Sequence, residues 1–288
     1  MKIFIKKSLK DSTSFGIGGV ADCFVEPKNI KELVSLIKYL RASNIIYYIL
    51  GKGTNVLVSD KGVHGCVVHI GDNLSNIKVK DNVIEAEAGA LVSDIAKEAL
   101  NHNLTGLEEL SGIPGTIGGA VAMNAGAYGK EMRDVVSSVN AIVDTGRVSK
   151  LTKEKLSFSY RSSSIQTKNY VATSVVITLQ PGKKNEILDK MNKFKELRWK
   201  NQPLEYRSAG STFKRPEGGF ASKLIQDSNL KGECIGDAMV SEKHAGFIVN
   251  MGNATSSDVY KLIEKVKQTV KVYFAINLEP EIKFWGKF

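Results

Sequence analysis

The sequence predicts an α+β fold built from two or three compact units. Three observations lead to this prediction. The 288 residues exceed the usual size of one domain. Short runs rich in β-branched and aromatic residues recur along the chain between a few helical patterns. Two glycine-rich turns, "GKGTN" and "GIPGTIGG", each lie next to a β-like run.

The first hundred residues are expected to form two helices and several short strands. Asn29 can cap a helix over residues 30–40, and a second helical pattern runs from Val92 to Leu100. Strands are expected wherever β-branched and aromatic residues gather between these patterns. These runs are residues 45–50, 56–60, 66–70, 76–80 and 83–89.

The rest of the chain is expected to begin with strands and to continue with a long charged helix. Runs at 139–144 and 171–179 predict strands. The helix ends before Pro203, and its apolar positions at helical spacing are Ile187, Leu188, Met191, Phe194 and Leu197. The turn-rich residues 202–219 suggest a change of domain.

Beyond this boundary the sequence predicts a helix, a strand over 246–252, and a capped helix after Ser257. The apolar residues expected to face inward from that last helix are Val259, Leu262, Ile263 and Val266. Residues 276–286 are expected to form an edge strand, because Pro280 cannot donate to a β-ladder.

Charge and composition narrow the function classes. The formal net charge is +10, but the basic residues are mixed with acidic ones along helices, so no nucleic-acid partner is expected. A basic surface suits a polyanionic small molecule such as a nucleotide sugar or NADPH. No run approaches the ~18 apolar residues of a membrane span, and the basic first residues lack the apolar region of an export signal. The expected location is the cytoplasm, with no membrane partner.

Cysteine and histidine usage favours neither disulfides nor metal. The three cysteines are odd in number and far apart in sequence, which argues against a disulfide framework; they are Cys23, Cys66 and Cys234. The four histidines show no metal-binding spacing, so no metal site is expected; they are His64, His69, His102 and His244.

The two glycine turns have two interpretations. Glycine leaves room for a ligand, and free N–H groups at turns bind anions such as a nucleotide phosphate. Tight packing with no ligand is the alternative. The chain lacks a P-loop motif, and the GxGxxA match at Gly16 follows polar residues rather than the buried strand that a dinucleotide fold requires.

Seven motifs, taken in order, resemble the UDP-N-acetylenolpyruvoylglucosamine reductase family over nearly the whole chain. They are "TSFGIGG", "GKGTNVLVSD", "SGIPGTIGGAVAMNAGAYG", "SYRSSS", "AGSTFKRP", "VSEKHAGFIVN" and "LEPEI". The resemblance implies the FAD-binding fold of the vanillyl-alcohol-oxidase type, made of two α+β subdomains, plus a C-terminal α+β substrate-binding domain. The implied bounds are 1–60 joined by 272–288 for the first subdomain, 61–182 for the second, and 183–271 for the substrate domain.

The resemblance also implies a reaction. The family uses NADPH, through FAD, to reduce UDP-N-acetylglucosamine enolpyruvate to UDP-N-acetylmuramate in peptidoglycan precursor synthesis. FAD is expected to be non-covalent, because neither glycine turn contains a His or Cys, and the chain is expected to be a monomer. The implied cofactor-binding residues are Gly51, Lys52, Gly53, Thr54, Asn55, Val56, Leu57, Gly112, Ile113, Pro114, Gly115, Thr116, Gly118, Gly119, Asn124, Ala125 and Gly126.

Three residues match the catalytic positions of the family. Arg161 suits a carboxylate through two parallel hydrogen bonds, Ser211 matches the proton donor, and Glu281 matches the carboxylate that polarises the intermediate. The implied substrate-binding residues are Tyr160, Arg215, Lys231 and His244. Arg207 and Arg215 depart from many relatives, and the length suggests the shorter class, which lacks an extra loop over the substrate.

Two other functions fit parts of the sequence. An FAD-dependent oxidase of the same superfamily would share the glycine turns but not the three catalytic motifs. A basic nucleic-acid-binding protein would explain the charge alone.

Overall fold

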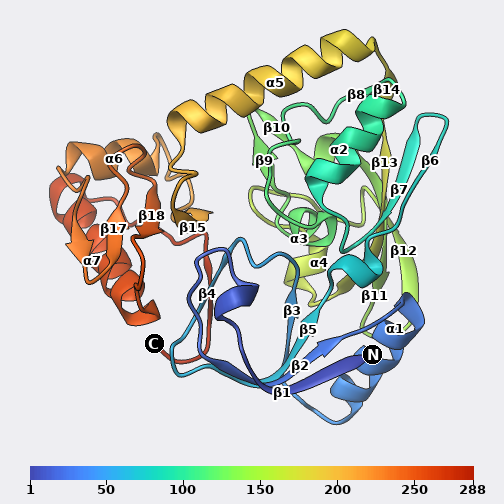
Figure 1. Cartoon of the computed structure of the whole chain (residues 1–288), viewed down its shortest axis with the longest axis horizontal. Helices are drawn as coiled ribbons and strands as arrows, with labels where there is room; N and C mark the ends of the chain where they lie inside the picture. The colour runs from blue at the N-terminus through green and yellow to red at the C-terminus, as the bar shows by residue number, and fades with distance from the viewer. The chain divides into compact units, whose positions relative to one another are not determined.

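The computed structural model describes all 288 residues and divides into two compact units. The first unit comprises Met1–Phe4, Phe24–Lys52 and Gly65–Leu197, and the second comprises Ile5–Cys23, Gly53–His64 and Arg198–Phe288. The chain therefore passes from one unit to the other several times. Figure 1 shows the helices and strands in their order along the chain. No helix of the protein combines the length and the apolar character that a membrane span requires.

A four-stranded sheet contains the earliest strands. Its order is β1 (Lys2–Ser8), β2 (Val20–Glu26), β5 (Val63–His69) and β3 (Tyr47–Leu50). Strand β3 runs parallel to β5. The sequence prediction placed no strand before residue 45 and therefore missed both β1 and β2. Strand β1 is exposed along almost its whole length, so its sequence lacks the alternation of apolar and polar residues that indicates a strand.

Helix α1 (Ile30–Ala42) begins where the sequence predicts. The Asn29 side chain accepts a hydrogen bond from Glu32 N at 2.9 Å, and the buried stripe is Leu33, Leu36, Ile37 and Leu40. Burial of four aliphatic side chains on one face stabilises a helix that is too short to persist alone.

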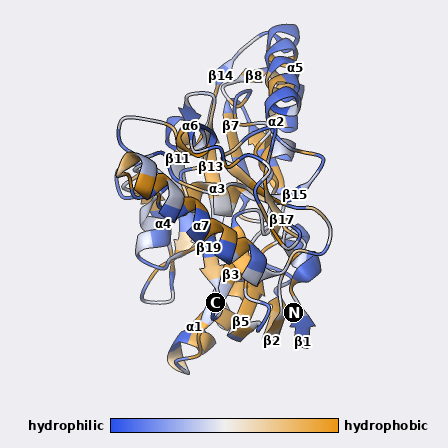
Figure 2. Cartoon of the chain, turned by 90° about the vertical axis from the view of Figure 1, so that its left-hand side faces the viewer, coloured by the Kyte–Doolittle hydropathy of each residue, from blue (hydrophilic) through white to orange (hydrophobic).

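A five-stranded antiparallel sheet forms most of the first unit. Its order is β12 (Val148–Thr152), β11 (Val136–Ile142), β13 (Val171–Thr178), β7 (Val83–Glu87) and β6 (Ile77–Lys80). Helices α2 (Val92–Asn101) and α3 (Ile117–Ala122) lie against it. Figure 2 shows the inner strands β7, β11 and β13 largely hydrophobic, as expected for the covered part of the sheet.

Short elements complete the first unit. They are η2 (Asp72–Leu74), β8 (Leu104–Thr105), β9 (Gly126–Ala127), β10 (Lys130–Glu131), η3 (Met132–Asp134), α4 (Ser164–Thr167) and β14 (Gln180–Pro181).

Helix α5 (Lys184–Asn201) is as long as expected but is not a core helix. Of its five predicted apolar positions only Ile187 is buried, and Leu188 is exposed. Phe194 instead packs against Tyr128 in a tilted arrangement, with ring centroids 4.7 Å apart. Figure 2 shows α5 mostly hydrophilic, because its charged residues outnumber the apolar ones around the helix.

The second unit is organised around a four-stranded antiparallel sheet. Its order is β15 (Arg207–Ser211), β18 (Phe247–Asn250), β17 (Ala238–Val240) and β16 (Cys234–Ile235). Helices α6 (Ala221–Asp227) and α7 (Ser256–Phe274) contribute to its core. The predicted inward residues Val259, Leu262, Ile263 and Val266 are fully buried.

Two distant segments pair elsewhere in this unit. Strand β19 (Lys283–Trp285) runs parallel to β4 (Val56–Val58), with Phe284 opposite Leu57. The predicted edge strand over 276–286 is thus shorter than expected, and Pro280 lies outside it, in an isolated bridge with Phe213. A 3-10 turn, η1 (Lys10–Ser12), completes the unit.

Helix α7 begins two residues earlier than predicted. Its cap is Thr255, which forms a reciprocal capping box with Asp258. Asp60 adds a second cap, because its two carboxylate oxygens accept hydrogen bonds from Ser256 N at 2.9 Å and Ser257 N at 3.1 Å. The sequence could not reveal this partner, which lies almost two hundred residues away.

Replacing Asp60 with alanine is expected to destabilise the second unit. The first turn of α7 loses two charge-assisted acceptors, a change worth about 1–2 kcal/mol at a helix N-terminus. Urea unfolding should show a lower midpoint than in Asp11→Ala, a control at another exposed aspartate of the same unit. Equal midpoints would mean that the Thr255 capping box suffices.

Candidate functional site

The two glycine-rich turns predicted to bind the cofactor come into contact at Gly51 and Thr116, in the first unit. A Cβ atom built on Gly51 would lie 2.3 Å from Thr116 Oγ1, so no other residue fits there without movement. Thr116 is buried and caps α3, accepting a hydrogen bond from Gly119 N. Gly51 therefore stands beside the start of α3.

Backbone hydrogen bonds attach the start of α3 to the turn that follows β7. Ile117 N donates to Ala90 O at 2.8 Å and Gly118 N donates to Ala88 O at 2.9 Å. A Cβ on Gly118 would approach Ala88 Cβ to 2.9 Å, which explains this glycine by packing. A Cβ on Gly119 would meet only Thr116 Oγ1, at 3.4 Å, so packing does not require that glycine.

The segment before α3 forms a tight, partly exposed turn. Ile113 N donates to Leu110 O and Gly115 N to Ile113 O, each at 3.0 Å, and Pro114 is exposed. Glu108 anchors the start of this segment: Gly106 N donates to its carboxylate at 2.7 Å. Burial acts to raise the pKa of Glu108, but hydrogen bonds from Thr105 and from the backbone outweigh it and hold the pKa below its ordinary value.

The residues after Gly51 leave backbone donors unused. The amide N–H groups of Lys52, Gly53 and Thr54 donate no hydrogen bond within the protein. Successive free amides can bind an anion where the backbone alternates between right- and left-handed conformations, and Gly53 has a left-handed φ of +67°. Lys52 belongs to the first unit, and Gly53 through Leu57 belong to the second.

Residues 55–57, at the end of this turn, are held by contacts within the protein. Val56 and Leu57 are buried in β4, so any ligand contact from them is limited to the backbone. The Asn55 side chain donates to Glu281 O at 3.2 Å, and Asn55 O accepts from Lys283 N. The predicted cofactor turn is thereby attached to the segment that carries Glu281.

Arg161 lies at the tip of a two-residue turn in the first unit. Ser159 and Ser162 exchange backbone hydrogen bonds of 3.0 and 3.2 Å, which leaves Tyr160 and Arg161 between them. The guanidinium carbon of Arg161 lies 5.1 Å from the centre of the Tyr160 ring. Arg161 has φ of +53°, a left-handed conformation that costs about 1–2 kcal/mol for a residue with a Cβ.

Ser211, at the end of β15, and Glu281, two residues before β19, lie on segments of the second unit that are joined by backbone hydrogen bonds. Glu281 N donates to Thr212 O at 2.8 Å, and Lys214 N donates to Glu279 O at 2.9 Å. Ser211 is exposed at the end of β15, beyond a break in the register with β18. The structure therefore joins Glu281 to the residue that follows Ser211, whereas Arg161 lies in the first unit.

Two lysines near Glu281 were not predicted from the sequence. Desolvation lowers the pKa of Lys283, and the Lys214 charge lowers it further, while the Glu281 carboxylate opposes the shift. Lys214 also pairs with Glu279 at 2.9 Å. The spacing Glu281-x-Lys283 in an extended segment could have indicated this, because side chains two residues apart share a face.

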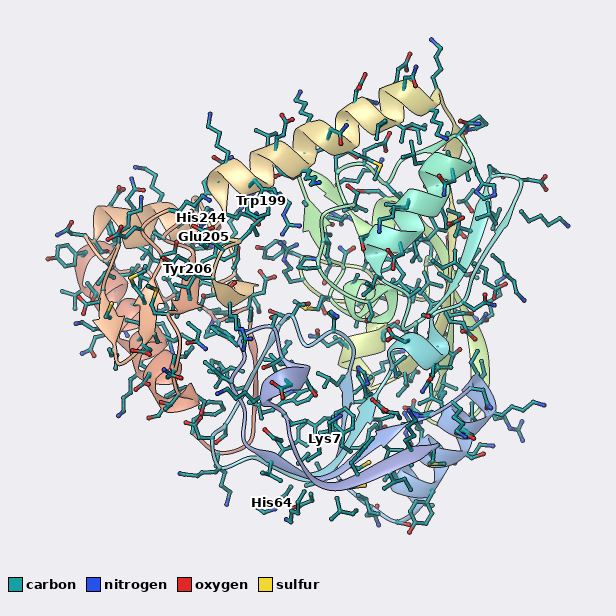
Figure 3. The ribbon with its side chains drawn as sticks, in the orientation of Figure 1. Lys7, His64, Trp199, Glu205, Tyr206 and His244 are labelled. Carbon is teal, nitrogen blue, oxygen red and sulfur yellow. The ribbon has the colours of Figure 1, made fainter.

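The predicted substrate-binding residues of the second unit lie on several segments. Arg215 stacks on Phe220, with its guanidinium carbon 4.4 Å from the ring centre. Lys231 is exposed, and its charge reaches His244. His244 Nδ1 accepts from Gly246 N at 3.2 Å, and its ring meets Phe247 edge-on. Figure 3 labels His244 in this part of the structure.

His244 is expected to weaken the second unit as the pH falls. Burial lowers the pKa of His244 below its ordinary 6.5, and the Lys231 charge adds to this effect, while a backbone hydrogen bond opposes it. The unfolded chain then binds more protons than the folded chain between the two pKa values, so stability rises with pH across that window and levels off above it. Thermal unfolding of His244→Gln should depend less on pH below about pH 6.5 than that of the parent or of His102→Gln at an exposed site. Parallel profiles for all three proteins would contradict this role.

Two family models match the chain. The model described as "FAD binding domain" matches residues 21–152, and "UDP-N-acetylenolpyruvoylglucosamine reductase, C-terminal domain" matches residues 202–285. Together they support the expected fold, with an FAD-binding part followed by a family-specific part.

Individual relatives are similar to this chain over almost its full length. The UDP-N-acetylenolpyruvoylglucosamine reductase of Caldanaerobacter subterraneus is 50% identical over 99% of this chain and 94% of its own. That of Clostridium kluyveri is 45% identical over 99% of this chain and 93% of its own. The crystal structure of UDP-N-acetylenolpyruvylglucosamine reductase from Thermus caldophilus has a TM-score of 0.84 at 36% identity, covering 99% and 98% of the two chains.

A more distant structure bears on the fold alone. Cholesterol oxidase from Brevibacterium sterolicum has a TM-score of 0.50 at 18% identity, covering 62% of this chain and 38% of its own. The predicted FAD-binding fold is confirmed by these matches. The chain belongs to the UDP-N-acetylenolpyruvoylglucosamine reductase family.

Proposed function

We propose that the protein reduces UDP-N-acetylglucosamine enolpyruvate to UDP-N-acetylmuramate, a step of peptidoglycan precursor synthesis. One NADPH and one proton are consumed, the vinyl double bond of the enolpyruvyl ether is saturated, and NADP⁺ is released. The structural observation that supports this most is the backbone hydrogen bond from Glu281 N to Thr212 O, which joins the segments that carry Ser211 and Glu281, both in the order of the family's motifs.

The residues of the two glycine turns fit FAD. Free amides at Lys52, Gly53 and Thr54 and the Lys52 side chain are donors suited to a pyrophosphate, and no acidic side chain lies in residues 110–119. The open side of Gly119 gives a ligand close access to the backbone. When bound, FAD accepts a hydride from NADPH and supplies it to the vinyl carbon of the substrate.

The side chains have separate tasks in this proposal. Arg161 binds the substrate carboxylate, where negative charge develops, through two parallel hydrogen bonds. Ser211 donates a proton to the carbon that bears the ether oxygen, and Glu281 orients that part of the substrate. Lys231, Arg215, His244 and Tyr160 are proposed to contact the nucleotide sugar. The basic net charge favours such a polyanionic substrate.

The three-part domain division predicted from the sequence remains part of this proposal. We also propose that the protein acts as a monomer in the cytoplasm, where nucleotide sugars and NADPH are available. Its product is proposed to contribute to cell shape and division.

Anaerobic spectroscopy tests the function. Purified protein should be yellow, NADPH should bleach the colour, and the enolpyruvyl nucleotide should restore it while gaining two hydrogen atoms by mass. Colour restored by oxygen but not by the nucleotide would favour the oxidase alternative. A colourless protein with salt-sensitive RNA binding would favour the nucleic-acid alternative.

FAD is expected to be held without a covalent bond. No His or Cys lies in either glycine turn to form one. Acid precipitation should release the yellow colour into the supernatant, and colour retained in the pellet would contradict the prediction.

A further inference from the structure

Asn124 is fully buried and uses both ends of its carboxamide within the first unit. Its Nδ2 donates to Glu131 Oε2 at 2.9 Å and to Ser159 O at 3.0 Å. Its Oδ1 accepts from Arg133 N at 3.0 Å. Both N–H groups are therefore occupied, and the side chain has no donor left for a ligand.

Glu131 fixes the orientation of this carboxamide. Its Oε2 accepts from Asn124 Nδ2 and also pairs with Arg133 Nε at 2.7 Å. The Glu131 side chain takes part in the capping box at the start of η3 as well. A carboxylate held from several sides holds the amide hydrogens of Asn124 in turn.

The Ser159 carbonyl bound by Asn124 belongs to the turn that carries Arg161. On the other side of this turn, Ser163 Oγ donates to Ala122 O at 2.9 Å. The turn is thus attached at both ends to residues 122–124 of the glycine segment.

The Arg161 backbone needs such support. Its left-handed φ is unfavourable for a residue with a Cβ, and such conformations persist where surrounding contacts impose them. The bond from Asn124 lies two residues from Arg161 in sequence. Its loss would free the turn to relax and move the guanidinium.

We propose, on the basis of the proposed function, that Asn124 is a positioning residue for Arg161 rather than a cofactor ligand. Its carboxamide sets the Ser159–Ser162 turn on the glycine segment, so the guanidinium is in place before the substrate carboxylate binds. Glu131 acts one step further away by fixing Asn124.

The test uses Asn124→Gly in the full-length protein. Asn124 has φ of +46°, which glycine adopts freely, so the variant loses the carboxamide without adding backbone strain. Asn103→Gly is the matched control, because Asn103 has φ of +56° but is exposed and uses only its backbone in hydrogen bonds. Asn124→Asp keeps the acceptor, loses the two donors, and sets a second carboxylate against Glu131.

Three measurements are made on each variant. FAD affinity, by fluorescence titration of the apoprotein, and the rate of bleaching by NADPH should stay within about twofold of the parent. The return of colour with the enolpyruvyl nucleotide should slow about tenfold to a hundredfold, as expected for a catalytic group displaced by about 1 Å. Asn103→Gly should match the parent throughout, and Asn124→Asp should behave like Asn124→Gly.

A double-mutant cycle with Arg161→Lys separates positioning from a general structural role. If Asn124 acts through Arg161, Asn124→Gly slows the return of colour far less in Arg161→Lys than in the parent. Equal, multiplicative losses in both backgrounds would overturn the proposal, as would weaker FAD binding in Asn124→Gly with unchanged reoxidation. If the parent itself fails to regain colour with the nucleotide, the proposed function fails instead, and the variants are not needed to show it.

Discussion

Arg161→Lys is expected to lower turnover of the enolpyruvyl nucleotide by roughly a hundredfold, in the range seen when one donor to a developing negative charge is removed. Lysine keeps the charge but cannot offer two parallel N–H groups to a carboxylate. FAD binding should be retained, because neither turn predicted to hold the cofactor contains Arg161. The measurement is steady-state NADPH oxidation together with flavin content.

The backbone at Arg161 adds a second expectation. Glycine adopts positive φ without strain, so Arg161→Gly should unfold within about 1 kcal/mol of the parent while losing the same activity. Arg147→Lys, at an exposed arginine of the first unit, serves as the control for the first substitution. Unchanged turnover in Arg161→Lys would remove Arg161 from the site.

Ser211→Ala is expected to affect one half-reaction alone. Bleaching by NADPH needs no proton at the substrate and should remain near the parent rate. The return of colour with the nucleotide should slow by roughly a hundredfold or more, the effect of losing a positioned general acid. Ser211→Cys should recover part of the rate, because a thiol also donates a proton.

Anaerobic stopped-flow absorbance follows the two half-reactions separately. Ser208→Ala is the control on the same strand, since the Ser208 hydroxyl accepts only a long bond from Gly210 N, at 3.4 Å. If Ser211→Ala regains colour as fast as the parent, Ser211 is a turn residue, and water or Glu281 becomes the next candidate for the proton donor.

Elements with strong local patterns were predictable from the sequence. The Asn29 cap and the apolar stripe of α1 lie within fourteen residues, and both appear as expected. Strand β1 was missed because its side chains are exposed and its only pattern is pairing with distant residues. The cap of α7 was misplaced although Thr255 and Asp258 form a capping box that can be read in the sequence, and only the added contact from Asp60 is distant.

In the candidate site, too, the motifs were predictable from the sequence, and the contacts between distant segments were not. The motifs identify Ser211 and Glu281 by resemblance, but their proximity depends on backbone pairing between residues 212–214 and 279–281. Of the lysines beside Glu281, Lys214 lies inside the motif "AGSTFKRP" but was assigned no role, and Lys283 lies one residue beyond "LEPEI". The two bonds donated by the Asn124 carboxamide also could not be inferred, because a turn asparagine is ordinarily expected to serve its own loop.

The parallel pairing of β4 with β19 has a consequence for synthesis of the chain. Strand β4 ends at Val58, and its partner begins at Lys283. A ribosome adding about 5–20 residues per second reaches β19 roughly eleven to forty-five seconds after β4. During that interval the apolar Val56–Val58 strand has no native partner and presents a pairing edge to other nascent chains. Because the partner of β4 is made this much later, the yield of the second unit in cells should depend on holdase chaperones more than that of the first unit.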